Sequence, residues 1–408
     1  MGRRYAGSNV PTVGEIVKKT TDFFSSKSET ARLDSELLIA SALGWERLQV
    51  YLKHDSSLSE EQLEKCRALV RRRAKGEPVA YILGEKGFYK HTFEVTSATL
   101  IPRPETEMLV VRGLEILSGR APGLTTRAKS QIQIEIAAAE AKRAEARRAE
   151  ELAEAKARGL DDDEIAKLAE AASGTNSASG MNVASGDIHL ESPMPGSNRM
   201  SPSSAGSAGS VTAADSRPTL TIVDLGCGTG CIGLSLASEL NSRANVRLVL
   251  VDVSEAAVEV AKRNAERMGL SAIAEFVVAD AGDESDLKNY FGLADLVVAN
   301  PPYIDPSDDR VEAAVREFEP TSALFAGAAG ERGIFEIARW SKVARRLVPP
   351  GGAALFEIGD RQGDESTKLF KEAGWDLVKL ARDHSDRERM VEASSKMPLK
   401  NSTEIHHG

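Results

Sequence analysis

The chain is short of cysteine, of long apolar runs and of positive charge, and each shortage excludes a class of protein. Three cysteines in 408 residues do not make a disulfide framework, which favours a reducing compartment. No apolar run approaches the length of a membrane-spanning helix, so we expect no membrane contact. A net charge of -9 argues against a protein whose main work is to grip the backbone of a nucleic acid.

Two further absences concern metals and export. Cys227 and Cys231 lie four residues apart, but no second pair of ligands accompanies them, so we predict no metal site. The first residues carry Arg3 and Arg4 and no acid before Glu15, yet they lack the apolar core of a secretory signal. We therefore expect a cytoplasmic protein, with a short mitochondrial presequence as the alternative.

The residues before 118 divide into two segments. Residues 1–77 carry apolar side chains at helical spacing, and Ser59 with Gln62 resembles a capping box, which predicts a small helical domain. The basic cluster at residues 71–73 either complements a helix dipole or contacts a partner. Residues 78–117 are predicted to form a β connector, with short strands at 81–84, 87–89 and 93–95, followed by a linking helix.

Residues 118–217 differ sharply in composition from the rest of the chain. Ala, Glu, Lys and Arg dominate residues 131–172, whereas Ser, Gly and Ala dominate residues 174–216. The first stretch is typical of a solvated helix with i,i+4 ion pairs, and the second of a flexible linker. Neither can build a core, so we interpret residues 118–217 as a low-complexity insertion at a surface junction.

Residues 218–398 alternate apolar strands with amphipathic helices. Strands are predicted at 220–225, 247–251, 275–279, 296–299, 353–358, 376–381 and 389–393. Helices are predicted at 231–240, 255–268, 331–347 and 367–373. This regular alternation predicts an α/β fold with a doubly wound, mostly parallel, seven-stranded sheet.

A glycine-rich loop, Asp224-Leu225-Gly226-Cys227-Gly228-Thr229-Gly230, follows the first of these strands. Its glycines let the backbone approach a ligand, and its spacing is tighter than that of the dinucleotide fingerprint, which disfavours a nicotinamide or flavin enzyme. Asp252, about twenty residues further on, can accept from both hydroxyls of a ribose. Asp280 ends the third strand and can reach an exocyclic amine. The set favours a nucleoside without a pyrophosphate.

The motif Asn300-Pro301-Pro302-Tyr303 follows the fourth strand, at the edge where ligands bind in an open α/β sheet. The Asn300 side-chain oxygen and the rigid Pro301 carbonyl can accept both hydrogens of a planar NH2 group, with Tyr303 against its plane. A turn without function is the alternative interpretation. Beside a nucleoside site, the motif predicts methyl transfer from S-adenosylmethionine to a nitrogen held in line with the methyl group.

Several stretches of the chain resemble the protein-(glutamine-N5) methyltransferases of the HemK/PrmC type. The resemblance covers Arg32-Leu33-Asp34-Ser35-Glu36-Leu37-Leu38, residues 71–78, residues 98–107, the glycine-rich loop, residues 300–304 and Arg316-Glu317-Phe318-Glu319-Pro320. The Asn-Pro-Pro-Tyr motif is shared with adenine-N6 methyltransferases. The N-terminal helical domain combined with Ile101-Pro102-Arg103-Pro104-Glu105-Thr106-Glu107 is much more specific.

The resemblance implies a class I S-adenosylmethionine-dependent methyltransferase that methylates the Gln of the Gly-Gly-Gln motif in class-one peptide-chain release factors. By the same resemblance, residues 1–77 recognise the release factor and residues 218–398 form the methyltransferase domain. The implied cofactor contacts are Asp224, Gly226, Cys227, Gly228, Thr229, Gly230, Asp252, Asp280, Ala281 and Asn300. The implied substrate contacts are Asn300, Pro301, Pro302 and Tyr303, of which Asn300, Pro301 and Tyr303 are the predicted catalytic residues.

Two departures and three alternatives accompany this interpretation. Family members often carry a large or aromatic residue at the position of Ala281, and the insertion at 118–217 has no counterpart in them. The alternatives are an adenine-N6 nucleic-acid methyltransferase, a ribosomal-protein glutamine methyltransferase and a catalytically silent release-factor binding protein. We expect a bacterial cytoplasmic monomer that takes a protein substrate and makes no direct contact with nucleic acid.

Overall fold

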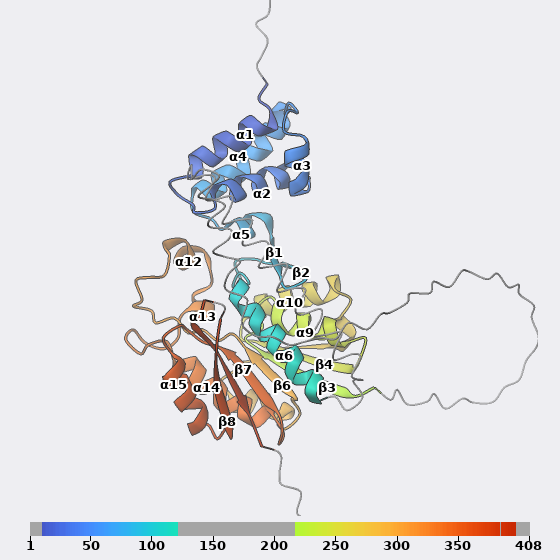
Figure 1. Ribbon diagram of the computed structural model, residues 1–408, viewed down its shortest axis with the longest axis vertical. Helices are drawn as coiled ribbons and strands as arrows, with labels where there is room; N and C mark the ends of the chain where they lie inside the picture. The colour runs from blue at the N-terminus through green and yellow to red at the C-terminus, as the bar shows by residue number, and fades with distance from the viewer. Residues whose placement is uncertain (1–9, 121–216, 384, 397–408) are drawn as a thin grey trace, which may run out of the picture. The chain divides into compact units, whose positions relative to one another are not determined.

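The computed structural model describes residues 10–120, 217–383 and 385–396 (Figure 1). The predicted insertion therefore lies almost entirely outside the described residues. Within the described ranges, none of the helices combines the length and the apolar composition needed to cross a membrane.

Residues 13–83 are predominantly helical, as predicted. The helices are α1 (Val13–Phe24), α2 (Ala31–Leu43), α3 (Arg47–Leu52), α4 (Glu60–Ala74) and α5 (Val79–Leu83). The predicted capping box at the start of α4 is confirmed, because the Ser59 hydroxyl accepts from the Gln62 N–H and the Gln62 side chain accepts from the Ser59 N–H. The buried faces of these helices meet in apolar clusters around Val13 and Phe24.

The basic cluster at the end of α4 makes ion pairs within the chain. The Arg73 guanidinium donates to the Asp34 carboxylate on α2 at 2.9 Å, which joins α4 to α2. Arg72 donates to Glu77 at 2.8 Å. These pairs give the cluster a role inside the helical part of the protein.

The strand predicted at residues 81–84 is wrong, because this stretch lies in α5 and at its end. Pro78 precedes the helix, and Gly84 ends it with a left-handed φ of 75°. Ile82 packs with Phe24 in a buried apolar cluster. Burial of one side of this single turn outweighs the preference of its residues for strands, which depends on context.

Beyond α5 the chain forms two short strands, each beginning two residues before the strands predicted at 87–89 and 93–95. Strands β1 (Glu85–Phe88) and β2 (His91–Glu94) pair in an antiparallel two-stranded sheet. A short 3-10 turn, η1 (Pro104–Thr106), then leads into the linking helix α6 (Glu107–Arg120).

The main sheet has seven strands in the order β5-β4-β3-β6-β7-β9-β8. They are β3 (Thr219–Leu225), β4 (Asn245–Asp252), β5 (Ala274–Val278), β6 (Leu296–Ala299), β7 (Ala353–Glu357), β8 (Leu377–Arg382) and β9 (Glu388–Ser394). The first five pair in parallel, whereas β9 runs antiparallel to β7 and β8. The predicted doubly wound, mostly parallel sheet of a class I methyltransferase is thereby confirmed.

Helices connect these strands. They are α9 (Cys231–Leu240), α10 (Glu255–Arg267), α11 (Glu284–Leu287), α12 (Ala313–Phe318), α13 (Thr321–Leu324), α14 (Phe335–Leu347) and α15 (Gly363–Glu372). The helix predicted from residue 331 begins at Phe335 instead, because Gly333 has a φ of 69°, outside the helical region. The helix predicted at 367–373 begins four residues earlier, at Gly363.

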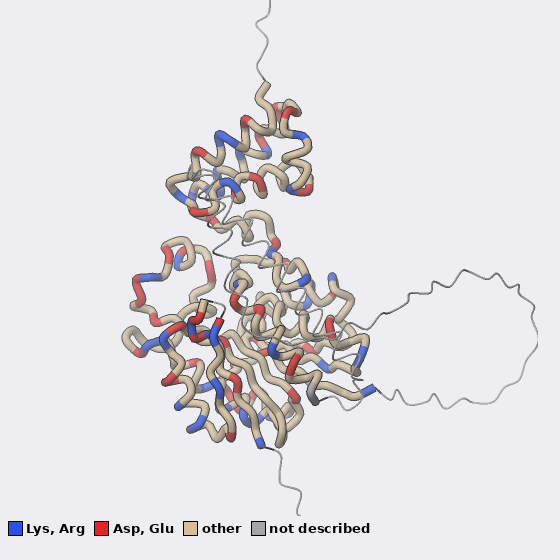
Figure 2. The backbone as a smooth tube through the Cα atoms, viewed as in Figure 1, with Lys and Arg blue, Asp and Glu red and all other residues tan. Residues whose placement is uncertain are grey.

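Alternate residues of β6 face opposite sides of the sheet. Leu296 lies against α6, where a Cβ added to Gly113 would come within 3.0 Å of it. Val297 joins the buried cluster that contains Trp340 of α14. In Figure 2 the central strands are mostly tan, whereas charged residues lie on the helices and loops. The central strands of the sheet are thus buried by helices, and the loops at its carboxyl edge form the site.

Candidate active site

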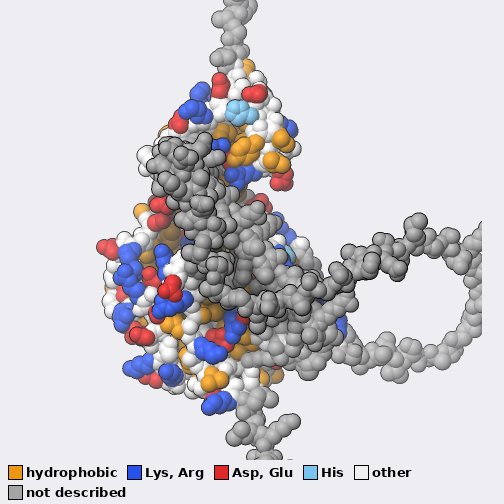
Figure 3. All heavy atoms as spheres, viewed as in Figure 1, with side chains coloured by type: hydrophobic (Ala, Val, Ile, Leu, Met, Phe, Trp, Pro, Cys, Tyr) orange, Lys and Arg blue, Asp and Glu red, His pale blue; other side chains and the backbone are white. Residues whose placement is uncertain are grey.

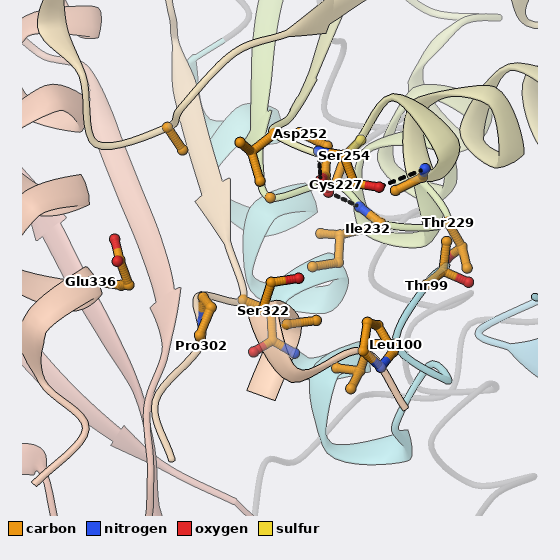
Figure 4. A pocket seen from close by; sticks show the side chains of 18 of the residues that line it. Thr99, Leu100, Cys227, Thr229, Ile232, Asp252, Ser254, Pro302, Ser322 and Glu336 are labelled. Carbon is orange, nitrogen blue, oxygen red and sulfur yellow. Dashed lines mark hydrogen bonds between the residues drawn. The ribbon is translucent and has the colours of Figure 1, made fainter. Parts of the chain in front are cut away.

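A cavity of about 320 Å³ lies at the carboxyl ends of β3, β4 and β6. Figure 4 shows Asp252 and Cys227 on one side of it and Pro302 on another. Nine predicted site residues line it, namely Gly226, Cys227, Gly228, Thr229, Asp252, Asp280, Ala281, Asn300 and Pro302. Residues far apart in the sequence are therefore brought to one edge of the sheet.

The glycine-rich loop follows β3 and leads into α9. Gly226, Gly228 and Gly230 all have left-handed φ angles, of 67°, 53° and 76°. A Cβ on Gly226 would lie 2.5 Å from the Trp340 ring, so this position has no room for a side chain. Around Gly228 nothing lies within 4 Å of an added Cβ, so the backbone there is open to a ligand.

Asp224 and Gly230 were predicted to contact the cofactor, but the structure does not place them among the residues that line the cavity. Asp224 lies beneath the loop and is fully buried. One of its carboxylate oxygens accepts from the Gly233 N–H at 2.8 Å, and burial raises its pKa to about 7. Asp224 thus joins the end of β3 to the first turn of α9.

Asp252 ends β4 and faces the cavity. One carboxylate oxygen accepts from the Gly228 N–H and the other from the Ser254 N–H, each at 2.9 Å (Figure 4). Burial raises the pKa of this carboxyl group above its usual range. Each carboxylate oxygen can accept more than one hydrogen bond, so Asp252 keeps capacity for hydroxyl donors.

Asp280 also lines the cavity and is held by a residue that the sequence did not indicate. The Arg339 guanidinium of α14 donates to Asp280 Oδ2 at 2.6 Å, and the Gly282 N–H donates to Oδ1 at 2.8 Å. Arg339 also donates to Glu336 at 2.9 Å. A Cβ at Gly282 would lie 2.6 Å from the Arg339 guanidinium carbon, so the small residue makes room for this ion pair.

A second cavity of about 390 Å³ lies on the other side of the Asn-Pro-Pro-Tyr motif. Pro301 and Tyr303 line it, together with Arg103 and residues of the loop 310–315. Asn300 lines both cavities. Leu100, Arg103 and Ala323 also line both cavities, so the two spaces are neighbours and Asn300 borders each of them.

A chain of hydrogen bonds lies behind the motif. Asn300 Nδ2 donates to Thr106 Oγ1 at 3.2 Å, and the Thr106 hydroxyl donates to Glu357 Oε2 at 2.6 Å. The Tyr303 hydroxyl donates to the other oxygen of Glu357, Oε1, at 3.0 Å. Burial raises the pKa of Glu357 above its usual range. The chain joins the end of β6 to η1 and to the end of β7.

Glu319 connects two of the stretches that carry the family resemblance. It is 4% exposed, and its carboxylate accepts from the Ile101 N–H at 3.1 Å and from Arg103 at 2.5 Å. The segment after β2 is thereby fixed to the loop after β6. Both segments contribute to the wall of the second cavity.

Thr106, Glu357 and Arg339 were missed as site residues. Glu357 had a usable signal, because an acidic residue at the end of an apolar strand is the same pattern that indicated Asp252 and Asp280. Thr106 lay inside the Ile-Pro-Arg-Pro-Glu-Thr-Glu stretch without an assigned role. An arginine on a predicted amphipathic helix gives no comparable signal.

Comparisons with known proteins agree with this geometry. The family model described as the PrmC N-terminal domain matches residues 15–84, and the methyltransferase small domain matches residues 205–326. A release factor glutamine methyltransferase of Chlorobaculum tepidum is 30% identical, over 93% of this chain and 95% of its own length. The enzymes of that name from Haemophilus influenzae and Rhodopirellula baltica are 29% and 27% identical, over 93% of this chain and 94% and 95% of theirs.

Proposed function

Because this chain belongs to the release factor glutamine methyltransferase family, we propose that it methylates the Gln of the Gly-Gly-Gln motif in class-one peptide-chain release factors. The methyl donor is S-adenosylmethionine, and the acceptor is the side-chain amide nitrogen of that Gln. One observation carries the proposal: Asn300 lines both cavities, so a single side chain can meet a donor on one side and an acceptor on the other.

The first cavity suits the donor. The open backbone at Gly228 gives space for a ligand, and Asp252 and Asp280 line the same cavity. Carboxylates are good acceptors for ribose hydroxyls and for an exocyclic amine. When bound, S-adenosylmethionine supplies an electrophilic methyl group.

The motif suits an amide acceptor. Because Asn300 Nδ2 donates to Thr106, the side-chain oxygen of Asn300 is directed away from that partner. This oxygen and the Pro301 carbonyl would accept the two hydrogens of the Gln amide and so fix the direction of its nitrogen lone pair. Positioning of this kind contributes much of the rate in a transfer between two bound groups. No general base is needed beforehand, because the nitrogen becomes acidic once it is methylated and then loses its proton to water.

The helical part supplies a surface on which the body of the release factor could bind. Leu48 and Leu52 of α3 are 65% and 76% exposed, and Tyr51 between them is 43% exposed. In Figure 3 hydrophobic side chains gather on this part of the molecule. Large exposed apolar side chains in a group are typical of a protein-binding surface.

Three further predictions remain: that the enzyme is cytoplasmic, that it is a monomer, and that it makes no direct contact with nucleic acid.

Transfer of labelled methyl groups from S-adenosylmethionine tests the proposal. Three acceptors are compared: an intact class-one release factor, the same factor with the Gly-Gly-Gln Gln changed to Ala, and duplex DNA. We expect label on the intact factor alone. Equal label on both factors would place the target elsewhere on the protein, and label on DNA would identify an adenine methyltransferase.

A further inference from the structure

In the chain of hydrogen bonds behind the motif, the chemistry of each group decides which partner donates and which accepts. Glu357 is 1% exposed, and its two carboxylate oxygens face two hydroxyl groups, those of Thr106 and Tyr303. Both hydroxyls donate to this carboxyl group, Thr106 Oγ1 to Oε2 at 2.6 Å and the Tyr303 hydroxyl to Oε1 at 3.0 Å. The single hydrogen of the Thr106 hydroxyl is therefore committed to Glu357.

This commitment decides which end of the Asn300 amide faces Thr106. With its hydrogen on Glu357, the Thr106 oxygen can only accept, and of the two ends of the amide only the NH2 group can donate. The Asn300 nitrogen therefore points to Thr106, and the oxygen points the other way. If the amide were turned by 180°, it would offer an NH2 group to the NH2 group of the acceptor, and two donors would meet.

We propose that Thr106 and Glu357 are positioning residues that hold the Asn300 side chain with its oxygen toward the acceptor nitrogen. This inference rests on the proposed function of Asn300. Thr106 also lines the first cavity, but the role proposed here requires no contact of either residue with the donor or the acceptor amide. Thr106 acts on Asn300 directly, and Glu357 acts on it through Thr106.

The fold makes this arrangement specific. Thr106 lies 194 residues before Asn300 in the sequence and 251 before Glu357, yet it contacts both side chains. It reaches them because η1 brings it to the carboxyl edge of the sheet, immediately before α6. Thr106 is itself 2% exposed, so water does not compete for these hydrogen bonds.

Thr106→Val tests the proposal, because it keeps the shape of the side chain and removes the hydroxyl. We expect kcat to fall by roughly 10- to 100-fold, somewhat less than the 10²–10³ that loss of one positioned polar group can cost. The dissociation constant for S-adenosylmethionine should change by less than about twofold. Thr106→Ser retains the hydroxyl and should restore kcat to within about threefold of wild type. Thr20→Val makes the same change at a buried position of α1 that lines neither cavity, and should leave kcat unchanged.

A double-mutant cycle separates positioning from a general structural effect. If Thr106 acts through Asn300, Thr106→Val should have almost no further effect on kcat in an Asn300→Ala background. A full additional loss in that background would overturn the proposal, as would a Thr106→Val enzyme with normal kcat. Glu357→Gln offers one acceptor for two hydroxyl donors and should also lower kcat with cofactor affinity retained.

The wild-type rate on the release factor is measured first. If the wild type labels no release factor, the proposed function fails, and the cycle can be run on whichever acceptor the wild type does label. If the wild type is active and Thr106→Val is equally active, only the positioning role fails.

Discussion

Asp224 carries a carboxyl group that the fold buries completely. One oxygen accepts from the Gly233 N–H, and the other has no hydrogen-bond partner among the described residues. Burial raises its pKa to about 7 from an ordinary value of 3.8, so the folded protein binds this proton more tightly than the unfolded chain does. The free energy of unfolding therefore falls as the pH rises from 3.8 to about 7, because the buried carboxyl group becomes increasingly costly to keep in the folded protein. Above about pH 7 the loss of stability reaches its full size.

Asp224→Asn should remove this pH dependence, because the amide stays neutral. At pH 5, which lies above the ordinary pKa of 3.8, the variant should already be the more stable by about 1.5 kcal/mol. At pH 8 the variant should be the more stable, by up to about 4 kcal/mol, since each pKa unit corresponds to about 1.4 kcal/mol. Denaturant unfolding of the cofactor-free protein at the two pH values measures the difference. An equal gap at both values would mean that the folded protein carries Asp224 ionised throughout.

At the scale of an element, the loop between β3 and α9 depends on close contact with α14. Gly226 has a positive φ, and a Cβ added there would overlap the Trp340 ring, which is itself part of the buried cluster. Because the Trp340 ring cannot move without disturbing the core, a side chain at Gly226 must displace the loop instead, toward the cavity that Gly226 lines.

Gly226→Ala should therefore lower the free energy of unfolding by about 2–4 kcal/mol, the sum of backbone strain and overpacking, and weaken cofactor binding at least about tenfold. Gly269→Ala is the matched control, because Gly269 has a similar φ of +69° and nothing within 4 Å of an added Cβ. It should cost only the backbone strain of about 1 kcal/mol and leave cofactor affinity normal. Calorimetric titration with S-adenosylmethionine and denaturant unfolding give both quantities. Equal effects of the two substitutions would mean that the Trp340 contact is unimportant.

Elements that depend on local pattern could be predicted from the sequence. The apolar run at residues 296–299 is followed by the polar Asn300, which predicted that the motif begins where a strand ends. The structure confirms this, because β6 ends at Ala299. The apolar residues 81–83 were misassigned because their packing on Phe24 decides their conformation, and that contact is not visible in a short window. The doubly wound, mostly parallel character of the sheet followed from the alternation of strands and helices, whereas the order of its strands was not predicted.

Contacts between distant residues could not be predicted in this way. The Arg339 ion pair with Asp280 spans 59 residues, and the bond from Thr106 to Glu357 spans 251. Such pairs form only when the folded sheet brings the ends of its strands close to each other. A short stretch of sequence therefore does not predict them. A candidate site could thus be assembled from residues at strand ends, while the partners that orient those residues could not.

At the scale of the whole molecule, all the described residues of the site lie outside residues 121–216. The residues that line the two cavities lie between 98 and 106 and between 226 and 340. Helix α6 starts beside Thr106 at the carboxyl edge of the sheet and runs past Gly113, which packs on β6, before it ends at Arg120. The chain returns at Thr219, where β3 begins, at the edge of the sheet opposite the cavities.

Replacement of residues 121–216 by a Gly/Ser linker of about twelve residues should retain the site. Such a linker has an average span of roughly 20 Å, enough to join one end of a helix to a nearby strand. We expect methyl transfer to a release factor within about threefold of the full chain and unchanged cofactor affinity. The assay is the labelled transfer described above. A folded variant that binds S-adenosylmethionine but no longer methylates the factor would assign residues 121–216 a part in substrate recognition.

The motif at residues 300–303 is rigid before any ligand arrives. Two consecutive prolines fix its backbone, and the Tyr303 carbonyl accepts from Gln362 Nε2 at 2.8 Å. Its conformational entropy is therefore lost when the protein folds, so the entropy lost on forming the complex falls on the incoming peptide alone. The backbone of residues 300–303 is already ordered in the free protein. Binding therefore costs little further conformational entropy at this motif.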